Sequence, residues 1–140
     1  MIAVEPFRSE HLEQLDLQPA QEHMRTYLTP DLLSKLESSS PAYSILDDGR
    51  TLACLGFFRW TDDAGIIWAY PARNLGRRMI IVHRCAARAI SALPGKVFAA
   101  VEHDFDEGHR WMDLLGFERV SHVAEYGPAR RPHDVYMRAH

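Results

Sequence analysis

Residues 66–78 read IIWAYPARNLGRR, and this stretch decides how the chain folds. The segment Ile66 to Tyr70 is apolar and ends at Pro71, which is typical of a strand. From Gly76 to Leu93 apolar residues recur at helical spacing until Pro94-Gly95 stops the pattern. We therefore expect a strand, a short loop that carries arginines, and a long amphipathic helix.

The neighbouring segments extend this unit into a sheet. Lys96 to Val101 is a short, mostly apolar run, as expected of a strand beside a parallel neighbour, so a strand-helix-strand unit is predicted. Upstream, Ala42 to Leu46 and Thr51 to Trp60 flank Asp47-Asp48-Gly49, which is a hairpin turn signal. These two strands and the strand at residues 66–70 should form an antiparallel meander.

The two ends of the chain add helices and strands. Ile2 to Phe7 alternates as a strand does, and Ser9 is a good helix N-cap. Leucines at helical spacing follow up to Ser38, with breaks at Pro19 and Pro30, so two or three short helices are expected. The C-terminal part predicts a helix and then two strands, over Asp106 to Leu115, Phe117 to Tyr126 and His133 to Ala139.

Length and composition predict one α+β domain over residues 1–140, with 46% apolar and 25% charged residues. A net charge of −3 provides no positive field for a nucleic acid or an anionic membrane. The apolar runs are too short to span a bilayer, and no leader-like segment is expected. Cys54 and Cys85 form no CxxC pair, and the eight histidines follow no HExxH or HxH pattern. We therefore expect a cytoplasmic protein without a metal.

The order of these elements resembles the fold of the GCN5-related N-acetyltransferase (GNAT) superfamily. The resemblance implies a mixed central sheet of about six to seven strands with helices on both faces. It also implies that strands 4 and 5, here Ile66 to Tyr70 and Val97 to Val101, splay apart and leave free backbone N–H groups between them. Short, divergent GNAT-like proteins encoded by phages are similar to this chain.

The loop before the long helix resembles the family's [Q/R]-x-x-G-x-[G/A] pyrophosphate loop. Arg73 and Gly76 match it, and Arg78 stands at the second small position. The resemblance implies acetyl-CoA as co-substrate, with its diphosphate held by backbone N–H groups at a helix N-terminus and by Arg77 and Arg78. The alternative is a basic first turn on a solvated helix. The residues assigned to the acyl-CoA site are Trp68, Ala69, Tyr70, Arg73, Leu75, Gly76, Arg77, Arg78 and Met112.

Residues 101–118 resemble a second family motif, a strand followed by N-x-x-A-x-x-x-Y-x-x-x-G-F. Gly108 and Leu115-Gly116-Phe117 fit it, whereas Phe105 replaces the asparagine and Met112 replaces the tyrosine. That tyrosine often protonates the departing thiolate, and a thioether cannot donate a proton. The alternatives are another acid, departure with little help, or a domain that binds without catalysing.

Two side chains are candidates for the chemistry. Glu102, at the C-terminal end of the second splayed strand, is the first choice for the general base, because ligands bind at such strand ends. Tyr126 is the candidate acid, and main chain near Trp68 to Tyr70 is the implied oxyanion donor. The alternatives are that Glu102 is a solvated loop residue and that Tyr126 covers the sheet.

The leading hypothesis is an acyl-CoA-dependent N-acyltransferase in which an amine, on a small molecule or a protein, attacks the thioester directly. Neither cysteine lies at a predicted nucleophile position, which argues against a covalent enzyme intermediate. The second hypothesis, favoured by Met112 and Phe105, is a catalytically inactive module used for protein interaction, for example in a phage virion or in host targeting. A third is an unrelated α+β domain in which Gly76 only opens a helix. Dimers through the terminal strands are common in the resembled family, and the alternating segment at residues 133–140 would permit a homodimer.

Overall fold

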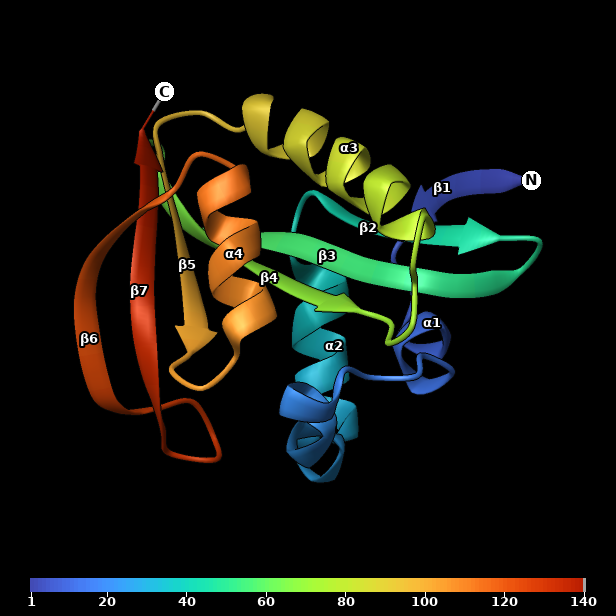
Figure 1. Ribbon diagram of the computed structural model, residues 1–140, viewed down its shortest axis with the longest axis horizontal. Helices are drawn as coiled ribbons and strands as arrows, with labels where there is room; N and C mark the ends of the chain where they lie inside the picture. Colours follow the sequence, from blue (N-terminus) through green and yellow to red (C-terminus); the bar gives the residue numbers. More distant parts are fainter. Residues whose placement is uncertain (140) are drawn as a thin grey trace.

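Residues 1–139, which a computed structural model describes, form one seven-stranded mixed sheet (Figure 1). The strands are β1 (Ile2–Pro6), β2 (Ala42–Asp47), β3 (Arg50–Thr61), β4 (Ala64–Pro71), β5 (Lys96–Glu102), β6 (Glu118–Tyr126) and β7 (Arg131–Ala139). Their order in space is β1-β2-β3-β4-β5-β7-β6, and β4 and β5 are parallel whereas the other neighbours are antiparallel. The expected mixed sheet and the meander β2-β3-β4 are confirmed.

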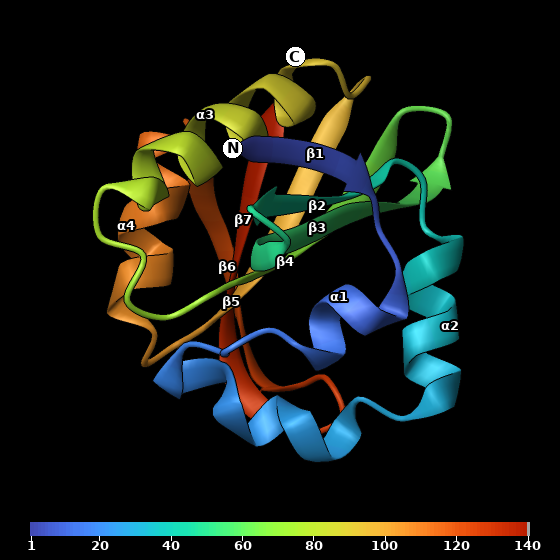
Figure 2. The same cartoon turned by 90° about the vertical axis from the view of Figure 1, so that its right-hand side faces the viewer.

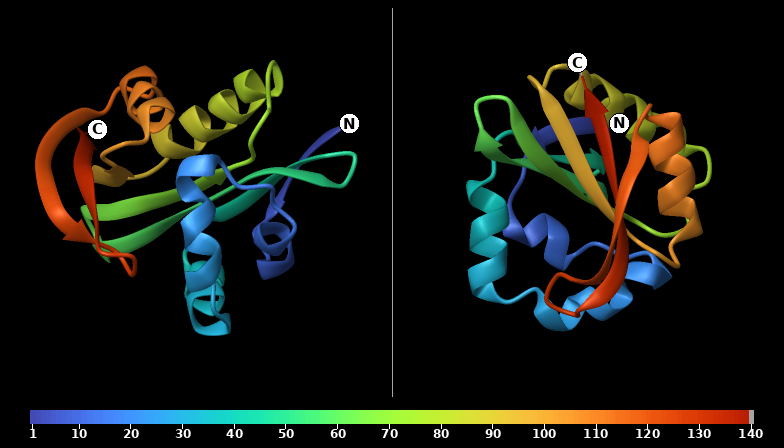
Figure 3. Two further views of the ribbon diagram at one scale, coloured as in Figure 1. Left: turned by 60° about the horizontal axis from the view of Figure 1, so that its bottom comes forward. Right: turned by 90° about the vertical axis from the view of Figure 1, so that its left-hand side faces the viewer.

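Helices cover both faces of this sheet, as expected (Figures 2 and 3). They are α1 (Ser9–Glu13), the 3-10 helix η1 (Pro19–Tyr27), α2 (Pro30–Ser38), α3 (Arg78–Ser91) and α4 (Asp106–Leu114). The helices α3 and α4 lie on one face, and α1, η1 and α2 lie on the other. Each face buries its own apolar cluster, with Val82 and Ile90 of α3 in one and Leu12 and Leu36 in the other. Within residues 1–139, no helix is long and apolar enough to cross a membrane.

Local sequence signals explain most element boundaries. The β2–β3 hairpin turns through Asp48 and Gly49, both at positive φ (48° and 84°), a conformation that Asp tolerates and Gly adopts freely. Pro19 and Pro30 are the first residues of η1 and α2, where a missing N–H costs nothing. The predicted turn residues therefore stand where the chain turns or a helix begins.

The predicted N-cap at Ser9 is wrong. Arg8 is the N-cap residue of α1, and its backbone N–H is accepted by Nδ1 of His11 at 3.2 Å. The Ser9 backbone N–H donates to a Glu37 carboxylate oxygen at 2.9 Å, and its hydroxyl donates to the same oxygen. The start of this helix is therefore stabilised both by a local cap from His11 and by Glu37, a side chain 28 positions from Ser9.

The sheet opens between β4 and β5. Parallel pairing ends at Ile67 and Ala99 within the described residues, although β4 continues to Pro71 and β5 to Glu102. Beyond that point each strand follows its outer neighbour, because β4 stays paired with β3 and β5 stays paired with β7. The expected splay of strands 4 and 5 is confirmed, and it creates the gap that holds the candidate site.

The strand β7 lies inside the sheet, between β5 and β6. Both of its edges are therefore occupied, and the exposed edge on this side belongs to β6. The expected homodimer through residues 133–140 cannot form by edge pairing of β7. His140, the last residue of that segment, lies outside the described residues.

Candidate functional site

A cleft of about 340 Å³ lies where β4 and β5 part; we call it the β4–β5 cleft. Side chains from both faces of the sheet reach it, because η1, α2, α4 and the β6–β7 turn all contribute to its wall. The predicted site residues that line it are Trp68, Ala69, Tyr70, Glu102, Met112 and Tyr126. The structure therefore brings both candidate catalytic side chains, Glu102 and Tyr126, into one cavity with the end of β4.

Glu102 lies in the wall of this cleft beside His23 and Arg131. Its Oε1 lies 2.6 Å from Nε2 of His23, and its Oε2 lies 3.9 Å from Nη1 of Arg131. The Glu102 side chain is 14% exposed and that of His23 is 17% exposed, so the pair is largely shielded from water. Although this distance is short, the buried Nε2 of His23 has no hydrogen-bond partner within residues 1–139. The solvated-loop alternative for Glu102 is therefore wrong.

Two phenols border the same cleft. Burial, with a contribution from the negative charge of Glu102, raises the pKa of Tyr70 to about 12. Burial also raises the pKa of Tyr126, whose ring packs against His133 with centroids 4.9 Å apart. Both hydroxyls therefore remain protonated at neutral pH and can donate a hydrogen bond into the cleft.

Main chain of β4 also faces the cleft. The Ala69 carbonyl accepts a hydrogen bond from Nε2 of Gln21 at 3.1 Å, and the Lys96 N–H donates to the Asp63 carbonyl at 2.7 Å. Odd-numbered residues of β4 therefore present their polar backbone groups to the β5 side. Because the N–H and C=O of one residue in an extended strand point to the same edge, the Ala69 N–H is directed into the gap.

The helix α4 closes the cleft on the opposite side. Met112 is 5% exposed and borders both the β4–β5 cleft and a small apolar cavity of about 40 Å³ beneath α3 and α4. Gly108 is required by close packing, because a Cβ there would lie 2.6 Å from the Phe105 ring and 2.8 Å from the Val101 side chain. The thioether of Met112 thus stands in the cleft wall, where it offers no proton.

The loop between β4 and α3 lies outside the cleft lining and forms a second, shallower feature. Backbone N–H groups of residues 74–77 have no acceptor in the part of the chain that the structure describes. Asn74 and Gly76 both have positive φ (59° and 57°), and a Cβ added at Gly76 would meet no atom within 4 Å. Alternating conformations of this kind turn successive N–H groups toward one point, which suits an anion.

The arginines of this loop are not equivalent. Nε of Arg78 lies 3.3 Å from a carboxylate oxygen of Asp47, so its guanidinium is already shared with the end of β2. The Arg73 N–H donates to the Asp16 carbonyl at 2.8 Å, which fixes the base of the loop. Among residues 1–139 no ion-pair partner lies within 4.0 Å of the side chains of Arg73 or Arg77, and the Arg77 side chain is exposed. Arg73 and Arg77 are therefore the better anchors for a phosphate.

Sequence reasoning missed His23 and Gln21. Both lie on η1, a 3-10 segment whose residues show no buried stripe, so no periodicity marks them. Their positions opposite Glu102 and Ala69 arise from packing between segments 48 or more positions apart. Only the assembled fold identifies them as part of the site.

Solved structures of acetyltransferases share this architecture over nearly the whole chain. Ard1 from Thermoplasma volcanium matches with a TM-score of 0.78 at 16% identity, covering 99% of this chain and 97% of that protein. A spermidine N-acetyltransferase SpeG chimera from Vibrio cholerae and hSSAT matches with 0.70 at 12% identity, covering 99% and 95%. A GNAT-family acetyltransferase from Bacillus cereus matches with 0.68 at 12% identity, covering 99% and 97%. This chain has the GNAT fold.

No protein-family model and no curated protein matches the sequence. A GNAT fold shared at such low sequence identity does not identify the substrate. The chemistry of this GNAT fold therefore depends on the residues of its own β4–β5 cleft and of its own β4–α3 loop.

Proposed function

We propose that this protein is an acyl-CoA-dependent N-acyltransferase in which an amine attacks the acyl thioester directly in the β4–β5 cleft. The observation that carries the proposal is the placement of the shielded Glu102–His23 pair in the same cavity as the inward-facing backbone of Ala69. A proton acceptor and an N–H donor on opposite sides of a reacting carbonyl are the groups that acyl transfer requires.

Glu102 is the proposed general base. An amine is protonated at neutral pH, so it must lose a proton before it attacks, and a carboxylate in the wall can accept that proton directly or through one water. His23 packs against the carboxylate, and the guanidinium of Arg131 partly compensates its charge. The negative carboxylate also attracts a cationic amine into a cleft whose wall is otherwise largely aromatic and apolar.

The N–H of Ala69 is the proposed donor to the thioester oxygen as negative charge develops on it. Met112 cannot protonate the leaving sulfur, so Tyr126 is the proposed acid, and Tyr70 is the other phenol in the wall. Both have raised pKa values and therefore hold their protons at neutral pH.

The β4–α3 loop fits the anionic end of acetyl-CoA, which would supply the activated acyl group. The free N–H groups of residues 74–77 and the side chains of Arg73 and Arg77 would hold the diphosphate. Arg78 would have to leave Asp47 in order to contribute. Gly76 leaves open space beside these N–H groups, which allows phosphate oxygens to approach the backbone.

The experiment that tests catalysis is a transfer assay with acetyl-CoA and a panel of amines, comparing Glu102→Gln with the wild type. Loss of a general base lowers turnover by about 10²–10⁴-fold while acetyl-CoA binding is retained. The matched control is Glu125→Gln, because Glu125 lies on exposed β6 and pairs only with Arg130 on the surface in the described chain. Equal turnover in Glu102→Gln and wild type would contradict the assigned base.

A second candidate function is a non-catalytic GNAT-like module that binds a protein partner, as in the phage-encoded proteins this chain resembles. The observation that favours it is Met112, which places a thioether in the cleft wall where the family motif has a phenol. This candidate predicts no transfer to any amine in the panel. It also predicts that Glu102→Gln changes neither acetyl transfer nor acetyl-CoA binding and affects only stability.

A cytoplasmic location agrees with the proposal. Cys54 and Cys85 are both free thiols, which is the usual state in a reducing compartment.

A further inference from the structure

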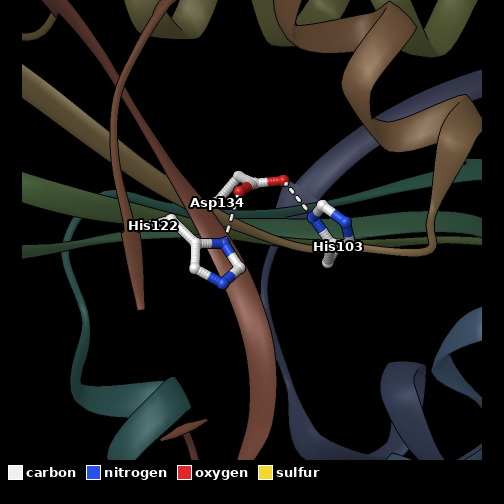
Figure 4. A group of neighbouring side chains, drawn as sticks. All are labelled: His103, His122 and Asp134. Carbon is white, nitrogen blue, oxygen red and sulfur yellow. Dashed lines mark hydrogen bonds and ion pairs between the residues drawn. The ribbon is translucent and has the colours of Figure 1, made fainter. Parts of the chain in front are cut away.

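A second polar cluster, His103, His122 and Asp134, lies at β7 and is not part of the lining of the β4–β5 cleft (Figure 4). Asp134 of β7 is buried, with a side chain 2% exposed. Its Oδ2 lies 3.0 Å from Nδ1 of His103, at the end of β5, and its Oδ1 lies 2.8 Å from Nδ1 of His122, its cross-strand partner on β6. One buried carboxylate therefore aligns an imidazole of β6 and an imidazole of the turn that follows β5.

We propose that His103, His122 and Asp134 form a binding site for a divalent transition-metal ion such as Zn²⁺. Two imidazole nitrogens and one carboxylate oxygen are a donor set that suits Zn²⁺, Ni²⁺ or Fe²⁺ and does not suit Mg²⁺ or Ca²⁺, which prefer oxygen ligands. The side chains of His103 and His122 are 52% and 49% exposed, so an ion can enter from solvent. Water would complete the coordination.

The distances allow this with small movements. Metal–ligand bonds of about 2.0–2.1 Å at tetrahedral angles place two ligand atoms about 3.3 Å apart. With the carboxylate bound through both oxygens, the separations of 3.0 Å from His103 to Oδ2 and 2.8 Å from His122 to Oδ1 would therefore open by a few tenths of an ångström. The three ligand atoms all lie within 4.8 Å of one another, so the two Nδ1 atoms approach by about 1.5 Å at most. Rotation of two half-exposed imidazoles supplies that movement.

Metal binding would displace the hydrogens that His103 and His122 carry on Nδ1. A carboxylate only accepts hydrogen bonds, so each Nδ1 that faces Asp134 carries a hydrogen. A metal ion bonded at Nδ1 takes the place of that hydrogen, and the proton moves through solvent to Nε2 or to the buffer. No oxidation or reduction is involved.

His109 and Tyr136 help to position the proposed ligands, whereas Arg119 competes with a metal ion for the Asp134 carboxylate. Nε2 of His109 donates to the His103 carbonyl at 3.0 Å, and Nδ1 of His109 accepts from the Tyr136 hydroxyl at 2.6 Å. These bonds hold the end of β5 beside β7, as outer-shell partners do in metal sites. Nη2 of Arg119 lies 3.6 Å from Oδ2 of Asp134, and since its side chain is 55% exposed it can withdraw into water when an ion binds.

The site is separate from the proposed acyl transfer. Asp134 and His133 are adjacent on β7, so their side chains lie on opposite faces of the sheet, and His133 lines the β4–β5 cleft. A bound ion would instead join β5, β6 and β7. No short motif marks this set in the sequence, because its members are 12 or more positions apart, and the expectation of a metal-free protein rested on short motifs alone.

Calorimetric titration of the tag-free, chelator-treated protein with Zn²⁺ tests the inference, with Co²⁺ absorption as a second readout of coordination geometry. We expect one-to-one binding and a higher melting temperature with Zn²⁺. His103→Ala and His122→Ala should each weaken binding by more than about 100-fold, beyond the range of outer-shell changes. His133→Ala is the matched control and should bind as the wild type does.

Either of two results would overturn the site: no Zn²⁺ binding by the wild type, or binding by His122→Ala that equals that of His133→Ala. Because His122 is half exposed, its truncation leaves the fold intact, which circular dichroism can verify. Failure of the transferase assay would leave this test unaffected, since no step of metal binding uses the cleft.

Discussion

Replacing Gly76 by glutamate should weaken acetyl-CoA binding by at least about 30-fold while the fold survives. Gly76 has φ +57°, so a side chain there costs about 1–2 kcal/mol of backbone strain, but no atom lies within 4 Å of the new Cβ. The added carboxylate would face a diphosphate. At 4 Å a pair of unit charges repels by about 1 kcal/mol in water and about 4 kcal/mol near a protein surface. Against two phosphate charges the loss is at least about 2 kcal/mol, or about 30-fold in affinity.

Calorimetric titration with acetyl-CoA measures this effect, and Gly116→Glu is the matched control. Gly116 also has positive φ (84°), and a Cβ there would meet only Nε of Arg138 at 3.9 Å. The control therefore carries similar strain and the same charge, but at the end of α4. Equal affinity of Gly76→Glu and wild type, with both folded, would refute the assignment of the loop.

Further predictions concern stability, reactivity and catalysis. Burial raises the pKa of the Cys54 thiol from its ordinary 9.0 to about 12. At pH 8 the native protein should therefore show fast reaction of Cys85 with a thiol reagent and none of Cys54, and the free energy of unfolding should fall as pH rises from 9 toward 12. Gly95→Ala should lower the free energy of unfolding in urea by about 2–5 kcal/mol, because its Cβ would lie 2.0 Å from the Asp63 carbonyl oxygen at φ +69°. Tyr126→Phe should lower turnover by about 100-fold or more and leave acetyl-CoA affinity unchanged in titration; normal turnover would exclude it as the acid.

Local chemistry explains why the fold was largely predictable from the sequence. The turn at Asp48-Gly49, the break at Pro94-Gly95 and the alternation of the flanking strands are signals carried by adjacent residues. The parallel pairing of β4 with β5 follows from the connecting helix α3, since a parallel neighbour requires a crossover. Element order and sheet type therefore needed no long-range information.

From the sequence, only those site residues that lie at the end of a strand could be predicted. Glu102 could be placed beside the gap because it ends β5, whereas His23, its neighbour at 2.6 Å, lies on η1, none of whose residues is buried. No sequence signal marked Asp134 as buried, and in the structure its oxygens lie beside the imidazoles of His103 and His122. Contacts between segments far apart in sequence decide these positions, and no local pattern records them.

The central claim is that the β4–α3 loop and the β4–β5 cleft together bind acetyl-CoA. The most direct measurement is isothermal titration of the wild-type protein with acetyl-CoA, with dephospho-coenzyme A as comparison. We predict a dissociation constant in the micromolar range for acetyl-CoA, and weaker binding without the 3′-phosphate because the loop arginines then attract a ligand of lower negative charge. Absence of binding at both low and moderate salt would contradict the claim and would favour the non-catalytic module.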